Sequence, residues 1–222
     1  RFVADAAHEL RSPLTALSLQ AEQLDAAAMS TQARERLASL RQGLRRARSL
    51  LDQLLTLARM QDVSHESTQA VSLQQVFREV LEDLMPLAET KNIDVGVVGQ
   101  QDASVTAPHS DLQTLVKNLV DNAIRYTPRD GQINLSAVGD EHGVILQVVD
   151  TGPGIVPEER ERVFDAFYRV LGQDQVGSGL GLSIVKTVSD RLGAKIGLAY
   201  ANESARSGLR VTVTFLRTGS AA

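Results

Sequence analysis

The chain has 222 residues, a formal net charge of −4 and no cysteine, with 43% hydrophobic and 23% charged residues. These proportions are ordinary for a soluble globular protein and leave room for one large domain or two smaller ones. The acidic balance argues against a nucleic-acid binder, and the absence of cysteine excludes disulfides, thiolate zinc sites and cysteine nucleophiles. No stretch approaches the roughly 18 uninterrupted apolar residues of a membrane span.

The first predicted element is a helix over residues 2–28 that carries a heptad repeat. Its apolar residues alternate at spacings of three and four, which keeps one narrow stripe facing a partner helix. These residues are Val3, Ala7, Leu10, Leu14, Leu17, Ala21, Leu24 and Ala28. His8 falls one place past the stripe, so we expect its ring to face water, with Ser12 on the same outer face. Pro13 removes one helical hydrogen bond and predicts a kink within a turn of His8.

A second heptad helix follows a short turn at residues 29–31. Its apolar positions are Leu37, Leu40, Leu44, Ala47, Leu51, Leu54 and Ala58. Two antiparallel helices with one narrow stripe each cannot bury both stripes well alone, whereas two such hairpins can do so as a four-helix bundle. We therefore expect an all-α hairpin over residues 1–62 that dimerises into a four-helix bundle, and hence a homodimer.

The next stretch, residues 61–69, is polar and lacks periodicity, which indicates a linker. We assign the linker between the two domains to residues 63–70. Beyond it, helices and strands mix along the chain. Predicted helices cover residues 72–90, 110–125 and 182–191, and predicted strands cover 93–98, 104–107, 132–138, 144–149, 195–201 and 209–216. The first helix opens on Ser72 and Gln75, a plausible capping box. This order predicts an α+β sandwich with helices on one face over residues 71–217, and a tail at 218–222.

Two asparagines stand on the predicted helix 110–125. Asn118 and Asn122 are four residues apart and therefore share a face of that helix. Asparagine is a poor helix former, so two of them on one face indicate a polar function. A neutral amide oxygen suits Mg²⁺, which takes few protein ligands beside substrate phosphates.

Glycines follow a carboxylate at the end of an apolar strand, in the string Asp150-Thr-Gly-Pro-Gly-Ile. Gly152 and Gly154 allow tight turns and a close approach of a ligand to the backbone. A buried carboxylate there would accept a hydrogen bond from the exocyclic amine of adenine, and the penalty for leaving it unpaired would give base specificity. A simple β-turn explains this string equally well when it is taken alone.

A second glycine-rich string, residues 177–182, opens the last predicted helix. Free N–H groups at a helix start favour phosphate. The string is neither a Walker loop nor a well-placed Rossmann fingerprint, because the lysine of the first and the strand context of the second are missing. Residues 164–169 and 171–176 lie between the two glycine strings, and we interpret them as a lid over a nucleotide with aromatic anchors.

Residues 8–13, His-Glu-Leu-Arg-Ser-Pro, preceded by Phe2 and Asp5, resemble the H box of sensor histidine kinases. The particular residues at these positions resemble the QseC-like branch of that family. The later strings, in their order, resemble the N, G1, F and G2 boxes of the same family's ATP-binding domain, the Bergerat (GHKL) fold. A lone exposed histidine on a helix is usually only a solvated side chain. Five ordered motifs over nearly the whole chain favour the family instead.

The resemblance implies a role for each matching residue. His8 would carry the phosphoryl group, Glu9 would accept its proton, and Ser12 would orient water for a phosphatase reaction. Asn122 would be the Mg²⁺ ligand with Asn118 in support. The remaining nucleotide-binding positions would be Asp150 at adenine, Arg125 and Tyr126 at the phosphates and sugar, and Gly152, Gly154, Gly177, Gly179, Leu180 and Gly181 in the two loops. Ser12 stands where threonine is frequent in the family, and Ala166 replaces a commoner bulky or charged residue of the F box.

The resemblance thus implies a protein-histidine kinase that uses ATP and Mg²⁺ and passes its phosphoryl group to the receiver domain of a response regulator. No nucleic-acid or membrane contact is expected within this stretch. Because a heptad already occupies the first residues in place of a signal peptide, we expect the cytoplasmic fragment of a longer protein, which the family places in the bacterial inner membrane. Two alternatives stay open: an ATPase of the gyrase or chaperone kind, and a non-catalytic dimerisation scaffold.

Overall fold

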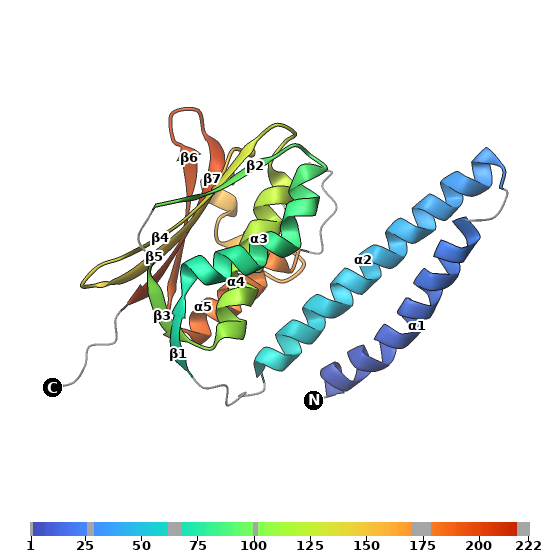
Figure 1. Cartoon of the computed structure of the whole chain (residues 1–222), viewed down its shortest axis with the longest axis horizontal. Helices are drawn as coiled ribbons and strands as arrows, with labels where there is room; N and C mark the ends of the chain where they lie inside the picture. The colour runs from blue at the N-terminus through green and yellow to red at the C-terminus, as the bar shows by residue number, and fades with distance from the viewer. Residues whose placement is uncertain (1, 26–28, 62–67, 100–101, 170–178, 217–222) are drawn as a thin grey trace. The chain divides into compact units, whose positions relative to one another are not determined.

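The computed structural model describes residues 2–25, 29–61, 68–99, 102–169 and 179–216. The chain divides into two compact units, residues 1–64 and 65–222, each of which has its own architecture (Figure 1). In the first unit, the side chains of residues 2–12 and of most residues between 45 and 61 also lie outside the described part.

The first unit is a helical hairpin of α1 (Phe2–Asp25) and α2 (Thr31–Gln61), which pack against each other. α1 continues through Pro13 as one helix. Ser30 caps the start of α2, because its Oγ accepts from Ala33 N at 3.2 Å and its carbonyl from Arg34 N at 3.0 Å. α2 therefore begins at Thr31, one residue earlier than predicted, and the predicted helix end at Ala28 lies outside the described residues.

The heptad stripe is only partly buried within this hairpin. Ala21 and Leu37 are buried between the helices, whereas Leu17 and Leu24 on α1 are 49% and 53% exposed. Leu40 on α2 is also 53% exposed. One hairpin thus leaves part of its predicted apolar stripe in contact with solvent.

The second unit has a five-stranded sheet with helices on one face (Figure 1). The strand order is β2-β4-β5-β7-β6, with β2 parallel to β4 and the other neighbours antiparallel. Its strands are β2 (Asp94–Val98), β4 (Gln132–Gly139), β5 (Gly143–Asp150), β6 (Lys195–Asn202) and β7 (Ser207–Leu216). Its helices are α3 (Leu73–Glu89), α4 (His109–Tyr126) and α5 (Gly181–Arg191). The predicted α+β sandwich is confirmed.

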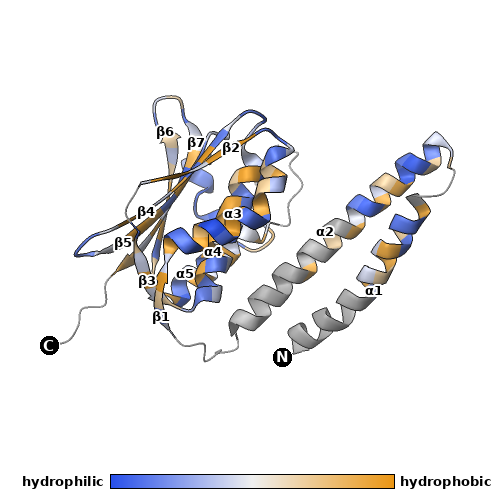
Figure 2. Cartoon of the chain, in the orientation of Figure 1, coloured by the Kyte–Doolittle hydropathy of each residue, from blue (hydrophilic) through white to orange (hydrophobic). Residues whose placement is uncertain are grey.

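Alternation along the strands builds the core of this unit. Ile133 and Leu135 of β4 and Leu146 of β5 are fully buried, whereas Val138 and Ile145 reach the other, open face of the sheet. The helix ribbons carry both hydrophobic and hydrophilic residues, as Figure 2 shows, which is the pattern of helices buried on one side. The site residues therefore stand on a packed two-layer scaffold.

One strand falls in the region predicted to be linker. β1 (Gln69–Ser72) pairs antiparallel with β3 (Ser104–Ala107), apart from the main sheet. Residues 63–67 of the predicted linker lie outside the described part. The predicted capping box is half formed: Ser72 Oγ accepts from Gln75 N at 3.1 Å, but the Gln75 side chain donates to Glu79 at 3.0 Å instead of returning to Ser72.

Two short 3₁₀ turns, η1 (Pro157–Glu159) and η2 (Arg162–Phe164), connect β5 to the region before α5. Within the described residues, none of the helices combines the length and the apolar character that crossing a bilayer requires.

Candidate active site

The two asparagines of α4 converge on the start of α5. The Asn118 amide group donates from Nδ2 to the carbonyl of Thr114 at 2.8 Å, which directs its oxygen away from the helix. A Cβ placed on Gly181 would lie 3.4 Å from Asn122 Oδ1 and 3.7 Å from Asn118 Oδ1. The predicted shared face is thus confirmed, and two amide oxygens flank the first residue of α5.

The backbone before α5 passes very close to Phe167, in the string of residues 164–169 that resembles the F box. Gly179 has φ +72°, and a Cβ there would lie 2.7 Å from the carbonyl carbon of Phe167. The N–H of Phe167 donates to the Gly179 carbonyl at 2.9 Å. Leu180, the next residue, is fully buried and anchors the start of α5. Gly177 and the predicted lid residues 171–176 lie outside the described residues.

Asp150, at the end of β5, is 4% exposed. Its Oδ1 accepts two backbone hydrogen bonds, from Gly152 N at 2.7 Å and Leu209 N at 3.2 Å. Burial raises the pKa of the Asp150 carboxyl group, and the bonds from Gly152 and Leu209 act in the opposite direction. Within the described residues both hydrogen bonds fall on one oxygen, which leaves Oδ2 as an open acceptor.

The turn after Asp150 is packed from several sides. Gly154 has φ +75°, and a Cβ there would lie 2.7 Å from the ring of Tyr200. Gly152 is buried, and its carbonyl accepts from Gly208 N at 2.7 Å. The predicted tight turn is therefore packed against other parts of the protein, and a close approach of a ligand to Gly152 and Gly154 stays a prediction.

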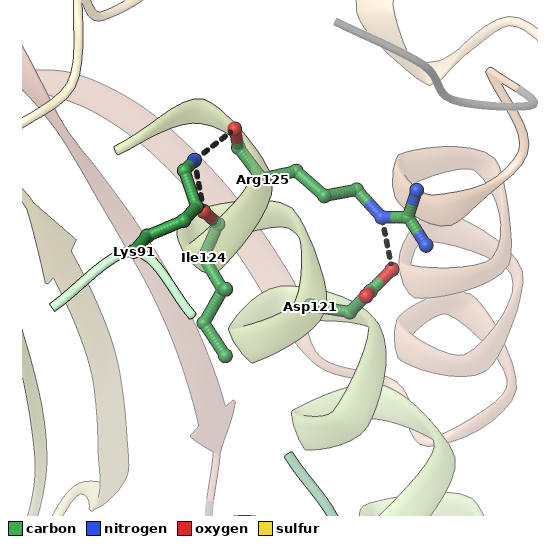
Figure 3. Close-up of polar contacts among 4 residues, drawn as sticks. All are labelled: Lys91, Asp121, Ile124 and Arg125. Carbon is green, nitrogen blue, oxygen red and sulfur yellow. Dashed lines mark hydrogen bonds and ion pairs between the residues drawn. The ribbon is translucent and has the colours of Figure 1, made fainter. Parts of the chain in front are cut away.

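Arg125 and Tyr126 occupy the last turn of α4 and are half-buried. Arg125 Nε donates to Asp121 Oδ2 at 2.7 Å, one turn earlier on the same helix, as Figure 3 shows. This pair holds the guanidinium group along the helix that also carries Asn122.

The aromatic anchors of the predicted lid are only partly as expected. Phe164 is half-buried, and the hydroxyl of Tyr168 donates to Glu159 while Arg162 stacks 4.3 Å from the Tyr168 ring centre. Phe167 is 59% exposed with φ +68°, so its ring is not a buried anchor. Its backbone bond to Gly179 holds this end of the segment instead, which corrects the prediction for this residue.

The H-box residues His8, Glu9 and Ser12 all lie in α1, as the resemblance requires. Their side chains lie outside the described residues. The spacing of four between His8 and Ser12 places both positions on one face of that helix.

Two residues of β7 belong to the site although no local pattern indicated them. Leu209 N–H completes the fixation of Asp150, and Gly208 N–H binds the Gly152 carbonyl. They reach the site because β7 pairs with β5, with Arg210 opposite Val149. The only signal in the sequence is a glycine next to a strand start, which often marks a close backbone approach.

The donor set fits a nucleotide with its magnesium ion. No cluster of three or more acidic, histidine or cysteine side chains able to hold a metal occurs among the described residues. Mg²⁺ bound with substrate phosphates needs only one or two protein oxygens, and the Asn118 and Asn122 amides offer two beside a glycine helix start.

Two family models match the chain, one for each unit. The His Kinase A (phospho-acceptor) domain matches residues 1–63. The model of the histidine kinase-, DNA gyrase B- and HSP90-like ATPase matches residues 107–219. The matches coincide with the helical hairpin and with the part of the second unit that contains α4, both glycine strings and every strand of the main sheet except β2.

Sensor kinases are among the proteins most similar to this chain. The sensor protein QseC of Salmonella typhi is 37% identical over 91% of this chain and 45% of its own length. The sensor protein kinase PmrB of Pseudomonas aeruginosa is 35% identical over 98% of this chain and 46% of its own length. A crystal structure of full-length ShkA in complex with AMPPNP is 27% identical with a TM-score of 0.74, over 98% of this chain and 46% of that one. The chain spans less than half the length of these relatives, and it belongs to the sensor histidine kinase family.

Proposed function

We propose that this chain is the kinase core of a two-component sensor, which transfers the γ-phosphoryl group of ATP to His8 and then to an aspartate of a response-regulator receiver domain. The observation that carries the proposal is the buried Asp150 carboxylate, with one oxygen held by two backbone N–H groups and the other open. An acceptor fixed in this way suits the exocyclic amine of adenine. A base without that amine would leave the buried oxygen unpaired.

The phosphate end of the nucleotide is assigned to α4 and the start of α5. Asn122 Oδ1 would hold the Mg²⁺ that offsets phosphate charge, with Asn118 in support. The N-terminus of α5 faces the phosphates with its free N–H groups, and Gly181 leaves the space for their approach. Arg125 and Tyr126 complete this end.

The proposed transfer is a displacement at phosphorus. An imidazole nitrogen of His8 forms the new N–P bond while the bond to the bridging oxygen breaks and ADP leaves. Glu9 accepts the proton from the other ring nitrogen, since imidazole is largely neutral near pH 7. Most of the acceleration comes from positioning and electrostatics, as in other phosphoryl transfers. Ser12 would orient water for the phosphatase reaction on the phosphorylated regulator.

The active form is proposed to be a homodimer through the helical hairpin. Leu17, Leu24 and Leu40 belong to the heptad stripes and are about half exposed in a single hairpin. A second hairpin would cover them in a four-helix bundle. The exposed leucines support this assembly because an unpaired stripe of this kind is costly in water.

We further propose that the whole protein is a sensor of the bacterial inner membrane whose kinase core faces the cytoplasm. The relatives with 35–37% identity are named sensor proteins, and ATP and receiver domains are both cytoplasmic. The stimulus-sensing part would then lie outside the 222 residues.

The experiment that tests the kinase is incubation of the purified chain with Mg²⁺ and γ-labelled ATP. A phosphohistidine label is lost in acid and kept in base, whereas a phosphoserine label behaves in the opposite way. Asn122→Ala should stop labelling and weaken Mg²⁺-dependent ATP binding while the far-UV circular dichroism stays native. ATP hydrolysis without acid-labile label would favour an ATPase of the gyrase or chaperone kind, and no nucleotide binding would favour a dimerisation scaffold.

A further inference from the structure

Lys91 lies in the turn between α3 and β2, outside every predicted motif. The turn is a Schellman-type helix end: Asn92 has φ +54°, Asn92 N donates to Glu89 O and Ile93 N donates to Ala88 O. The backbone of Lys91 is therefore fixed, and its side chain extends from this turn to the neighbouring helix α4.

The Lys91 ammonium group binds the carboxyl-terminal end of α4. Its Nζ donates to the carbonyls of Ile124 and Arg125, both at 2.8 Å, and of Thr127 at 2.5 Å, so all three of its N–H bonds are used. Figure 3 shows the first two of these bonds.

Pro128 explains why this end of the helix needs a donor from elsewhere. In a continuing helix the Ile124 carbonyl would accept from the N–H of residue 128, and proline has none. The last carbonyls of a helix also carry its negative dipole end, which favours a cation. Burial, and to a smaller degree the charge of Arg129, lower the pKa of Lys91. The three carbonyls favour its charged form and act against that shift.

Further hydrogen bonds join the segment after α4 to the turn at Lys91. Asp130 N donates to the Lys91 carbonyl at 3.1 Å, and the Asn92 side chain donates to Asp130 at 2.7 Å. Asp94 N then donates to Gly131 O at 2.9 Å. These hydrogen bonds hold the segment that follows α4 next to the turn that contains Lys91.

The last turn of α4, whose carbonyls bind Lys91, also carries Arg125 and Tyr126, the two residues proposed above at the phosphate end of the nucleotide. Arg125 gives its carbonyl to Lys91 while its guanidinium group pairs with Asp121 (Figure 3). The next carbonyl, of Tyr126, packs against Gly152, where an added Cβ would lie only 2.9 Å from it. A shift of this turn would therefore move Arg125 and would also disturb the turn after Asp150.

We propose that Lys91 is a positioning residue for nucleotide binding, whose ammonium group fixes the last turn of α4 so that Arg125 and Tyr126 are aligned before ATP arrives. The proposal rests on the nucleotide site proposed above. Lys91 acts through the backbone of that turn and contacts no ligand itself.

The test compares Lys91→Met with Lys117→Met. Lys117 is a matched control, because it stands on α4 itself and its ammonium group donates to an exposed side chain, Asp83, at 2.7 Å. The dissociation constant of ATP with Mg²⁺ is measured by calorimetric titration at a temperature where circular dichroism shows each variant fully folded. We expect Lys91→Met to weaken ATP binding about tenfold or more and Lys117→Met to leave it within about twofold.

A double-mutant cycle separates positioning from a general loss of structure. In an Arg125→Ala background the effect of Lys91→Met on ATP affinity should be smaller than in the parent, because one of the two aligned side chains is gone. Equal ATP affinity of Lys91→Met and the parent, or an undiminished loss in the Arg125→Ala background, would overturn the proposal.

If Lys91→Met does not fold, Lys91→Arg decides by the same two criteria, since a planar guanidinium keeps the charge but cannot direct three bonds at converging carbonyls. A parent chain that fails to bind ATP would instead refute the nucleotide site itself, so the two failures are distinguishable.

Discussion

The two units solve the burial of apolar surface in different ways. The sheet and helices of the second unit enclose their own core, with Leu146 and Val213 fully buried between the layers. The hairpin leaves Leu17 and Leu24 half exposed along its heptad stripe. A self-contained unit can hold a preorganised ligand site, whereas a unit with an unpaired stripe is built to meet a partner.

The same contrast applies to the functional residues. In the second unit, Asp150 and Asn118 are each fixed by hydrogen bonds to the backbone, so the site exists before any ligand arrives. In the first unit, His8 stands on a helix, and we propose it as the acceptor of the reaction and not as a part of the nucleotide site. The proposed division is therefore a rigid donor site in one unit and a substrate side chain in the other.

The sharpest test of this division is His8→Gln. Autophosphorylation should be lost completely, because no other side chain is proposed to accept the phosphoryl group. ATP affinity should stay within about twofold of the parent, since His8 contributes nothing to the nucleotide site. Acid-labile labelling and an ATP titration measure the two quantities. Loss of ATP binding in this variant would show that the units do not divide the work as proposed.

The second test concerns the unpaired stripe, through Leu17→Glu. Covering a leucine is worth about 1.5–3 kcal/mol, and a symmetric dimer contains the site twice. The dimer dissociation constant should therefore rise by about a hundredfold or more, as sedimentation equilibrium would show. Leu87→Glu is the matched control, because Leu87 is a 39% exposed leucine on α3 of the self-contained unit. An equal loss of dimer in both variants would remove the hairpin as the interface.

A third change tests whether the acceptor helix supplies chemistry of its own. Glu9→Ala should slow autophosphorylation by about a hundredfold or more, the usual contribution of a positioned base. ATP affinity should not change. Rapid-quench measurement of the labelling rate at saturating ATP gives the effect on the chemical step. A rate equal to that of the parent would assign the proton to another acceptor.

Local geometry explains which parts of this structure were predictable. The heptad helices, the β4–β5 hairpin and the shared face of Asn118 and Asn122 follow from spacings of two to seven residues, which sequence shows directly. The donor from Leu209 depends on the register of β7 against β5, and the reach of Lys91 depends on how α3 packs beside α4. Such contacts are tertiary, so no local pattern contains them.

Two further departures have equally physical reasons. β1 was missed because a strand of four residues with two exposed polar or small positions has no period to detect. Phe167 was expected to be one of the aromatic anchors of the predicted lid. Its backbone instead adopts a left-handed conformation against Gly179, which directs the ring to solvent.

The fourth prediction, on Asp150→Asn, tests the preorganised site. Asparagine can keep Oδ1 as the acceptor for Gly152 and Leu209. Its amide NH2 group replaces the open oxygen, however, so that a donor would face the amino group of adenine. ATP binding should weaken by about 1–3 kcal/mol. Asp140→Asn is the matched control, since Asp140 Oδ1 likewise accepts two backbone N–H groups, from His142 and Gly143, in an exposed hairpin turn. Equal ATP affinity of Asp150→Asn and the parent would remove Asp150 from the adenine site.

The raised pKa of Asp150 adds a pH dependence to this variant. In the folded parent the carboxyl group keeps its proton to a higher pH than in the unfolded chain, so the parent loses stability relative to Asp150→Asn as pH rises through the folded pKa. The variant should therefore gain in free energy of unfolding, relative to the parent, between about pH 3 and neutrality. Denaturant titrations at both ends of this range measure the gain. A constant difference would show that Asp150 titrates normally.

The smallest effect on labelling is expected for Ser12→Ala, which separates two activities on one helix face. Ser12 lies a full turn from His8 and takes no part in the attack on ATP, so labelling should stay within about twofold of the parent. Dephosphorylation of the regulator should slow by about two- to tenfold, the worth of one neutral hydrogen bond to a water. The measurement is the decay of purified phospho-regulator with each variant in the presence of ADP. Ser18→Ala is the control, because the Ser18 hydroxyl is already committed to the Leu14 carbonyl at 2.8 Å, and Ser12→Thr should keep the activity with a stiffer rotamer. Unchanged decay with Ser12→Ala beside an active parent would mean that another group holds the water.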